Sequence, residues 1–297
     1  MEGVKRDTWP KVLGCIVSQC RPDRASRRKE SARIVAKFSQ KIAGQTQKEI
    51  LIFDVDGVLV DVRETYWRSA IDTIRHLTGK RVTHAELHRW KAKRGNNDDW
   101  QMVANWATEL GRKTSYEEAR DAFGKFYWGT DERPGYVLRE KIIVQPRQIA
   151  RWAAQFELNL FTGRNRREFD YTFAKWPGTA HFRTIVTMDD VARMKPHPEG
   201  LYKILGKRDP ASALYVGDNI DDALAAREAG VPFAAIIAAN EHHYAKRAAM
   251  FRKLGAIALL PRVTAVSALL KKAIVGGLKV EGPKAKGTGR RRGRKYS

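Results

Sequence analysis

A nearly continuous apolar segment, ILIFDVDGVLV from Ile50 to Val60, constrains the fold of this chain more than any other feature. Only two aspartates and a glycine interrupt it. A strand that is buried on both faces has such an unbroken apolar sequence, whereas a strand with one solvated face alternates apolar and polar residues. The segment therefore predicts a strand inside a parallel sheet.

Shorter apolar runs recur along the chain and are separated by helix-like stretches. Strands that alternate with helices are typical of a doubly wound α/β fold, in which helices cover both faces of a parallel sheet. We therefore predict a three-layer α/β core. The runs that we expect to form its other strands are Glu157–Thr162, Phe182–Thr187, Ala213–Gly217, Pro232–Ile237 and Ala256–Leu260.

One interval does not follow this alternation. From Asp61 to Pro146 the pattern is helical and rich in tryptophan, without a convincing strand. About 85 residues between two strands are too many for a simple crossover. We therefore expect a separate helical domain at 62–146, inserted into an α/β core formed by 49–61 and 147–278.

The net charge of +23 is concentrated at the two ends of the chain. Residues 1–48 contain 12 Lys and Arg against 4 Asp and Glu, and residues 279–297 contain 8 against 1. Such polar, basic segments cannot bury a core, so we expect both ends to be poorly ordered. Basic tails of this kind bind nucleic acid through counterion release, although simple solvation is the favoured interpretation.

Cysteine content and hydropathy indicate the compartment. The chain has two cysteines, Cys15 and Cys20, which can form neither a disulfide framework nor a four-cysteine zinc site. The most apolar stretch, VPFAAIIAA at Val231–Ala239, is about half the length of a membrane span. We expect a cytoplasmic protein with no membrane partner.

Polar side chains follow several of the predicted strands. The carboxyl ends of parallel strands meet at one edge of a sheet, where ligands of open α/β sheets bind. Clustered carboxylates at that edge suit Mg²⁺, and a lysine with a hydroxyl beside them suits phosphate oxygens. The residues in question are Asp54, Asp56, Thr162, Gly163, Lys195, Asp218, Asp221 and Asp222.

Four motifs in this order resemble those of the haloacid dehalogenase-like superfamily. They are DVDG at Asp54–Gly57, TGR at Thr162–Arg164, Lys195-Pro196, and GDNIDD at Gly217–Asp222. The resemblance covers about residues 48–270 and implies a subfamily I hydrolase. It also implies that the helical insertion is the C1 cap, which closes over the site in that family.

The resemblance implies a role for each matched residue. Asp54 would be the nucleophile and a Mg²⁺ ligand, and Asp56 the general acid and base, with its backbone carbonyl also on the metal. Lys195 would orient the nucleophile and bind phosphate together with Thr162 and the Gly163 amide. Asp218 would be the second side-chain ligand. Asp222 would hold the outer shell of the metal, although the adjacent Asp221 competes for this role.

The same resemblance suggests a reaction class. Dehalogenases of the superfamily lack an aspartate at the position of Asp56, because a halide needs no proton to leave. We therefore predict a Mg²⁺-dependent phosphatase that hydrolyses a small phosphorylated metabolite through an aspartyl-phosphate. The alternatives are a sugar-phosphate phosphomutase of the same superfamily and a nucleic-acid-associated protein that acts through its basic tails.

A polar segment of the insertion, KRGNNDDW at Lys93–Trp100, has the composition of a specificity loop. Its Asn-Asn-Asp-Trp sequence resembles that of a subgroup found fused to, or beside, histidine-biosynthesis enzymes. This resemblance suggests a histidinol-phosphate-like substrate, and phosphoglycolate is the other candidate. We expect Arg94 or Asn97 to contact it, unless the segment is only a polar turn.

Overall fold

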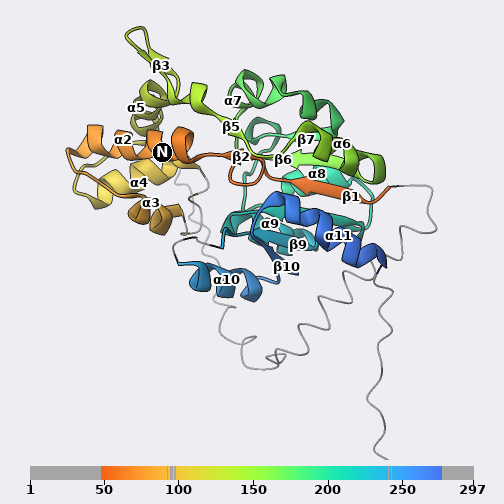
Figure 1. The fold of residues 1–297 in the computed structure, drawn as a ribbon. Helices are drawn as coiled ribbons and strands as arrows, with labels where there is room; N and C mark the ends of the chain where they lie inside the picture. The colour runs from red at the N-terminus through yellow and green to blue at the C-terminus, as the bar shows by residue number, and fades with distance from the viewer. Residues whose placement is uncertain are drawn as a thin grey trace, which may run out of the picture.

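The computed structural model describes residues 48–275, except 92, 94, 95, 97, 240 and 242, and of 272–275 only the backbone. A six-stranded parallel sheet forms its centre, in the order β10-β9-β8-β1-β6-β7 (Figure 1). The strands are β1 (Ile50–Phe53), β6 (Glu157–Phe161), β7 (Phe182–Val186), β8 (Ala213–Gly217), β9 (Phe233–Ile236) and β10 (Ala258–Leu260).

Strand β1 lies inside the sheet, as its apolar sequence predicts. All four of its residues are buried, and it pairs with β6 on one side and β8 on the other. Its side chains alternate between two hydrophobic clusters, with Leu51 and Phe53 in one and Ile50 and Ile52 in the other. Both faces of the sheet are therefore covered.

Helices form the outer two layers of the core. Side chains of α6 (Pro146–Gln155), α7 (Arg166–Tyr171) and α11 (Val266–Val275) pack on the face of Leu51 and Phe53. Side chains of α8 (Glu199–Leu205), α9 (Ile220–Ala229) and α10 (Tyr244–Lys253) pack on the other face. The predicted three-layer α/β class is confirmed.

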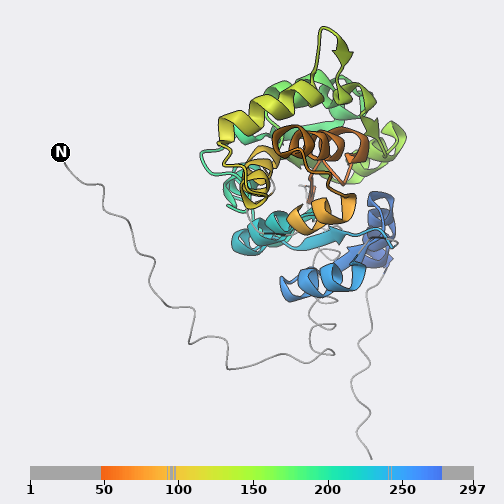
Figure 2. The ribbon, with the colours of Figure 1, turned by 90° about the vertical axis from the view of Figure 1, so that its left-hand side faces the viewer.

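A helical insertion separates β1 from β6 in the sequence. Figure 1 shows its helices grouped at the left of the sheet, and in Figure 2 this side faces the viewer. Trp90 and Trp106 stack in its interior with ring centroids 5.8 Å apart. It consists of η2 (a π-helical turn, Arg63–Trp67), α2 (Arg68–Thr78), α3 (His84–Lys91), α4 (Asp99–Glu109) and α5 (Tyr116–Tyr127).

Two connections join the insertion to the core. The first contains β2 (Val60–Asp61) and the second β5 (Lys141–Ile142), and these two strands pair antiparallel. A hairpin of β3 (Gly129–Thr130) and β4 (Arg133–Pro134) projects before the 3₁₀ turn η3 (Tyr136–Arg139). The expectation of no strand between Asp61 and Pro146 is therefore wrong for these short pairs. The domain limits themselves stay a prediction.

The remaining turns of the core are short 3₁₀ segments. They are η4 (Phe173–Lys175), η5 (Pro177–His181), η6 (Met188–Asp190), η7 (Pro210–Ser212) and η8 (Val263–Ala265). Within the described part of the chain, no helix has the length and apolar composition to cross a membrane.

Candidate active site

Two aspartates that follow strands and one from the first turn of a helix meet at the carboxyl edge of the sheet. Asp54 follows β1, Asp218 follows β8, and Asp222 lies in the first turn of α9. One carboxylate oxygen from each lies within 4.8 Å of the other two. The sequence prediction that these side chains come together is confirmed in the structure.

Lys195 lies beside this cluster and is buried. Its Nζ is 3.0 Å from Asp54 Oδ1 and 2.7 Å from Asp222 Oδ1. It also donates to the carbonyl oxygen of Phe161 at 3.0 Å and to the hydroxyl of Tyr215 at 3.1 Å. With these contacts the ammonium group is fixed between two of the three carboxylates.

Asp222, and not Asp221, belongs to the aspartate cluster. Asp222 Oδ2 accepts a hydrogen bond from the backbone N–H of Asn219 at 3.0 Å, which completes a capping box at the start of α9. Its Oδ1 accepts from Lys195 at 2.7 Å and from the Tyr215 hydroxyl at 2.7 Å. Helix geometry thus brings Asp222, the residue preferred from the sequence, into the cluster instead of its competitor Asp221.

The cluster carries more negative charge than Lys195 neutralises. Burial raises the pKa of Asp54 well above its ordinary value, although Lys195 lowers it in part. Burial and the Asp222 carboxylate raise the pKa of Asp218 to about 7. Burial acts to lower the pKa of Lys195, but Asp222 and Asp54 outweigh it and raise that pKa. Such a set of crowded oxygen donors fits a hard divalent cation.

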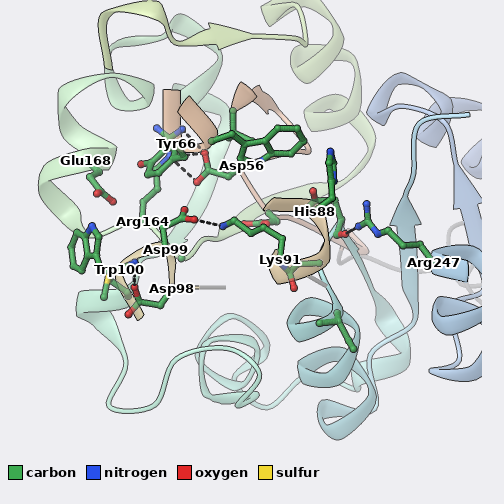
Figure 3. A pocket seen from close by; sticks show the side chains of 18 of the residues that line it. Asp56, Tyr66, His88, Lys91, Asp98, Asp99, Trp100, Arg164, Glu168 and Arg247 are labelled. Carbon is green, nitrogen blue, oxygen red and sulfur yellow. Dashed lines mark hydrogen bonds and ion pairs between the residues drawn. The ribbon is translucent and has the colours of Figure 1, made fainter. Parts of the chain in front are cut away.

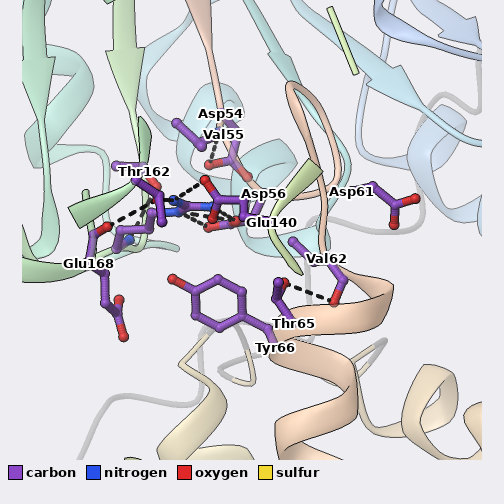
Figure 4. Close-up of polar contacts among 12 residues, drawn as sticks. Asp54, Val55, Asp56, Asp61, Val62, Thr65, Tyr66, Glu140, Thr162 and Glu168 are labelled. Carbon is purple, nitrogen blue, oxygen red and sulfur yellow. Dashed lines mark hydrogen bonds and ion pairs between the residues drawn. The ribbon is translucent and has the colours of Figure 1, made fainter. Parts of the chain in front are cut away.

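Asp56 has a different set of contacts. Its carboxylate lies outside the aspartate cluster and accepts hydrogen bonds from Arg164, with Nη2 at 2.6 Å and Nε at 3.0 Å. Arg164 is buried and also contacts Glu140 of the second connection. Figure 4 shows Asp56 and Glu140 close together, with the Tyr66 ring on the side of the helical insertion.

Thr162 and Gly163 follow β6 at the same edge. Thr162 is buried, and its hydroxyl accepts a hydrogen bond from the backbone N–H of Arg164 at 3.1 Å. Gly163 lines a pocket that also includes Asp54, Asp56 and Asp218. The structure therefore brings the predicted phosphate-binding segment to the predicted nucleophile.

The pocket lies between the core and the helical insertion (Figure 3). One ion pair crosses its insertion side, with Lys91 Nζ 2.5 Å from Asp99 Oδ1. Asp98 caps α4 by accepting from the backbone N–H of Trp100 at 2.9 Å. The residues that the insertion and its first connection contribute are Val62, Tyr66, Trp67, His88, Lys91, Asp98, Asp99 and Trp100.

The two predicted specificity residues, Arg94 and Asn97, lie outside the described residues. Asp98, Asp99 and Trp100 of the same segment do line the pocket, so its polar composition did indicate part of the site. Arg164 ends the TGR motif but had no predicted role, and neither Tyr66 nor Glu168 was predicted as a site residue. The sequence did contain a signal for Arg164, because this charged residue directly follows Thr162-Gly163 at the end of a strand. Neither Tyr66 nor Glu168 lies in a recognisable motif.

Comparison with known proteins agrees with this geometry. Residues 152–236 match the family model described as haloacid dehalogenase-like hydrolase. The fold is similar to the crystal structure of a predicted phosphoglycolate phosphatase from Haemophilus somnus, with a TM-score of 0.59, 18% identity, and coverage of 76% of this chain and 99% of that one. Over these residues the chain is similar to the haloacid dehalogenase-like hydrolases, and its fold is that of the matched structure.

In sequence, this chain is also similar to two named proteins. It is 28% identical over 184 residues to a phosphoglycolate phosphatase of Yersinia pestis, which covers 61% of this chain and 77% of that protein. It is also 28% identical over 192 residues to an imidazoleglycerol-phosphate dehydratase of Phytophthora nicotianae. That match covers 61% of this chain but only 42% of the dehydratase, so the chain spans less than half of it.

Proposed function

We propose that this hydrolase cleaves a small phosphomonoester with the help of Mg²⁺, through a phosphorylated Asp54. The observation that carries the proposal is the contact between Asp54 and Lys195, at 3.0 Å, beside the carboxylates of Asp218 and Asp222. A carboxylate can attack phosphorus, provided that neighbouring cations offset its repulsion from the anionic ester.

Asp54 and Asp56 would share the reaction in two steps. In the first, Asp54 attacks phosphorus, the bond from phosphorus to the ester oxygen breaks, and Asp56 gives its proton to the leaving alcohol. In the second, Asp56 takes a proton from water, whose oxygen attacks the same phosphorus. The bond to Asp54 then breaks and inorganic phosphate leaves.

Asp54, Asp218 and the backbone carbonyl of Asp56 would hold Mg²⁺, with Asp222 in the outer shell. The bound cation would offset the charge of the transferring phosphoryl group. Lys195, Thr162 and the Gly163 amide would bind phosphoryl oxygens. Asp222 supports this assignment for Lys195, because its carboxylate fixes the Nζ at 2.7 Å and leaves it directed at Asp54.

The substrate proposal rests on similarity. The similarity to relatives named phosphoglycolate phosphatase and imidazoleglycerol-phosphate dehydratase supports a small phosphorylated metabolite as the substrate, such as phosphoglycolate or histidinol phosphate. The position of the pocket under the helical insertion supports a small ester over a polymer end, because the insertion contributes one wall. Arg94 and Asn97 stay predicted substrate contacts.

The test is phosphate release from a panel of phosphomonoesters with Mg²⁺. Asp54→Asn and Asp56→Asn should each lower turnover by at least about 100-fold. Asp61→Asn is the matched control, because Asp61 belongs to the same segment but contacts Arg63 instead of the pocket. Isomerised sugar phosphate without net phosphate release would indicate a mutase. A folded wild type that releases no phosphate from any ester would contradict the proposal.

A further inference from the structure

Arg164 is a buried arginine that the proposed reaction does not use. Its side chain has 0% exposed surface. Its Nη1 donates to Glu140 Oε1 at 3.2 Å and to the Thr172 hydroxyl at 3.0 Å, and its Nη2 is 2.7 Å from Glu140 Oε2. A buried guanidinium is costly unless its charge is paired, so carboxylates must account for its position.

The contact between Arg164 and Asp56 has a forked geometry. Nε lies 3.2 Å from Oδ1 and 3.0 Å from Oδ2, and Nη2 lies 2.6 Å from Oδ1. Several bonds from a planar guanidinium fix the orientation of a carboxylate as well as its position, which a single bond does not. The Asp56 side chain is 28% exposed, so without this contact it could adopt other staggered rotamers.

Arg164 is held by one side chain of the second connection and by one at the start of the helical insertion. Glu140 lies in the second connection, between η3 and β5, and its side chain is only 5% exposed. Tyr66 lies in η2, after the first connection, and its ring centroid is 5.5 Å from the guanidinium carbon of Arg164. Arg164 thus contacts Asp56 and one side chain near each connection.

We propose that Arg164 is a positioning residue that holds the Asp56 carboxyl group in place for proton transfer, and that Glu140 in the second connection and Tyr66 at the start of the insertion fix Arg164. The role given to Asp56 rests on the proposed phosphatase function. General acid and base catalysis requires hydrogen-bond reach to the proton that moves, and a misplacement of about 1 Å can lower the rate about 100-fold. The position of the Asp56 carboxyl group therefore depends on how the helical insertion packs against the core.

The kinetic test uses 4-nitrophenyl phosphate, whose leaving group departs without a proton. In Arg164→Met the first step should survive, whereas attack by water should slow. We expect a burst of one equivalent of 4-nitrophenolate, followed by a steady rate about 100-fold below that of wild type. Added guanidinium should restore part of the steady rate. Arg164→Lys keeps the buried positive charge but cannot make the forked contact with Asp56, so it should show the same burst. This variant replaces Arg164→Met in the test if the methionine variant does not fold.

Arg166→Met is the matched control. Arg166 lies two residues further on, pairs with Asp190 at 2.9 Å and is absent from the pocket lining. The Arg166→Met variant should hydrolyse 4-nitrophenyl phosphate as wild type does. A purely structural role for Arg164 predicts that the burst and the steady rate fall together, without rescue by guanidinium, and this result would overturn the proposal.

Crystal structures of the same variants without substrate test the proposal independently of activity. In Arg164→Met and Arg164→Lys, Asp56 should leave its present rotamer, whereas in Arg166→Met it should stay within about 0.5 Å. An unmoved Asp56 in both Arg164 variants would refute the positioning role. A wild type without phosphatase activity would instead refute the proposed function, and the crystal structures would still decide what holds Asp56.

Discussion

Glu168 is a buried carboxyl group in the first turn of α7. Its Oε2 accepts a hydrogen bond from the backbone N–H of Asn165 at 3.3 Å, as part of a capping box. Burial raises the pKa of Glu168 to about 8, although the nearby Arg164 lowers it in part. At neutral pH the folded protein therefore holds a proton on this side chain that the unfolded chain releases.

This pKa predicts the sign of a pH effect on stability. Because the pKa of Glu168 is higher in the folded state, the free energy of unfolding should fall as pH rises from about 4.5 to about 8. Glu168→Gln removes the titrating group. The melting temperature of this variant should rise relative to that of wild type between pH 5 and pH 9.

Glu117→Gln provides the control, because it removes a glutamate from an exposed position in the first turn of α5. The difference in melting temperature between Glu117→Gln and wild type should change little over the same pH range. If the difference in melting temperature between Glu168→Gln and wild type stays constant with pH, the Glu168 carboxyl group is already ionised in the folded protein and the prediction is wrong.

The residues that bear chemistry differ in how far the sequence predicts them. Asp54, Lys195 and Asp218 follow strands in recognisable motifs, and the structure brings them together. The contact of Arg164 with Glu140 could not be predicted, since the two side chains belong to different parts of the chain and neither has a hydrophobic signal. Only the folded topology places them 2.7 Å apart.

At the level of elements, the turn after β1 leaves no room for a side chain at Gly57. Gly57 has φ +75°, and a Cβ there would lie 2.1 Å from Asp218 Oδ2. Gly57→Ala should therefore displace Asp218 from the aspartate cluster. We expect this variant to lose the stabilisation by Mg²⁺, which for wild type should be about 2.7 kcal/mol at 100 times the dissociation constant.

Gly79→Ala is a matched control for this effect. Gly79 follows α2 with φ +70°, but nothing lies within 4 Å of a Cβ at that position. The variant should lose about 1 kcal/mol through backbone strain alone and keep its response to Mg²⁺. Melting curves of both variants with and without Mg²⁺ would separate the two effects, and an unchanged response in Gly57→Ala would argue against a metal on Asp218.

Strands were predictable where they were long enough to form an apolar run. The run Ala213–Gly217 coincides with β8, and the other long runs contain β6, β7, β9 and β10. The short pairs β2–β5 and β3–β4 have two residues in each strand, which is too few to produce a periodic pattern. Their position follows from the geometry of the connections instead.

At the scale of the whole molecule, the basic segment 279–297 lies outside the described residues and its role stays a prediction. The alternative to simple solvation is that its eight Lys and Arg bind nucleic acid through counterion release, in which case the affinity would fall about 10³- to 10⁵-fold between about 50 and 200 mM salt. Deletion of 279–297 should weaken an electrophoretic shift at low salt and leave phosphate release unchanged. Activity that depends on this segment would instead favour a nucleic acid substrate.

The position of β1 determines when the site can form during synthesis. Ile50 of β1 pairs with Glu157 of β6 and Ala213 of β8, so the strand that precedes the proposed nucleophile has no sheet neighbour until much later parts of the chain emerge from the ribosome. Contacts so distant in sequence form slowly, because a long loop must close first. The helical insertion is translated completely before either neighbour of β1. A nascent chain that ends before residue 213 therefore leaves at least one edge of this apolar strand unpaired, and an unpaired apolar edge favours aggregation during translation.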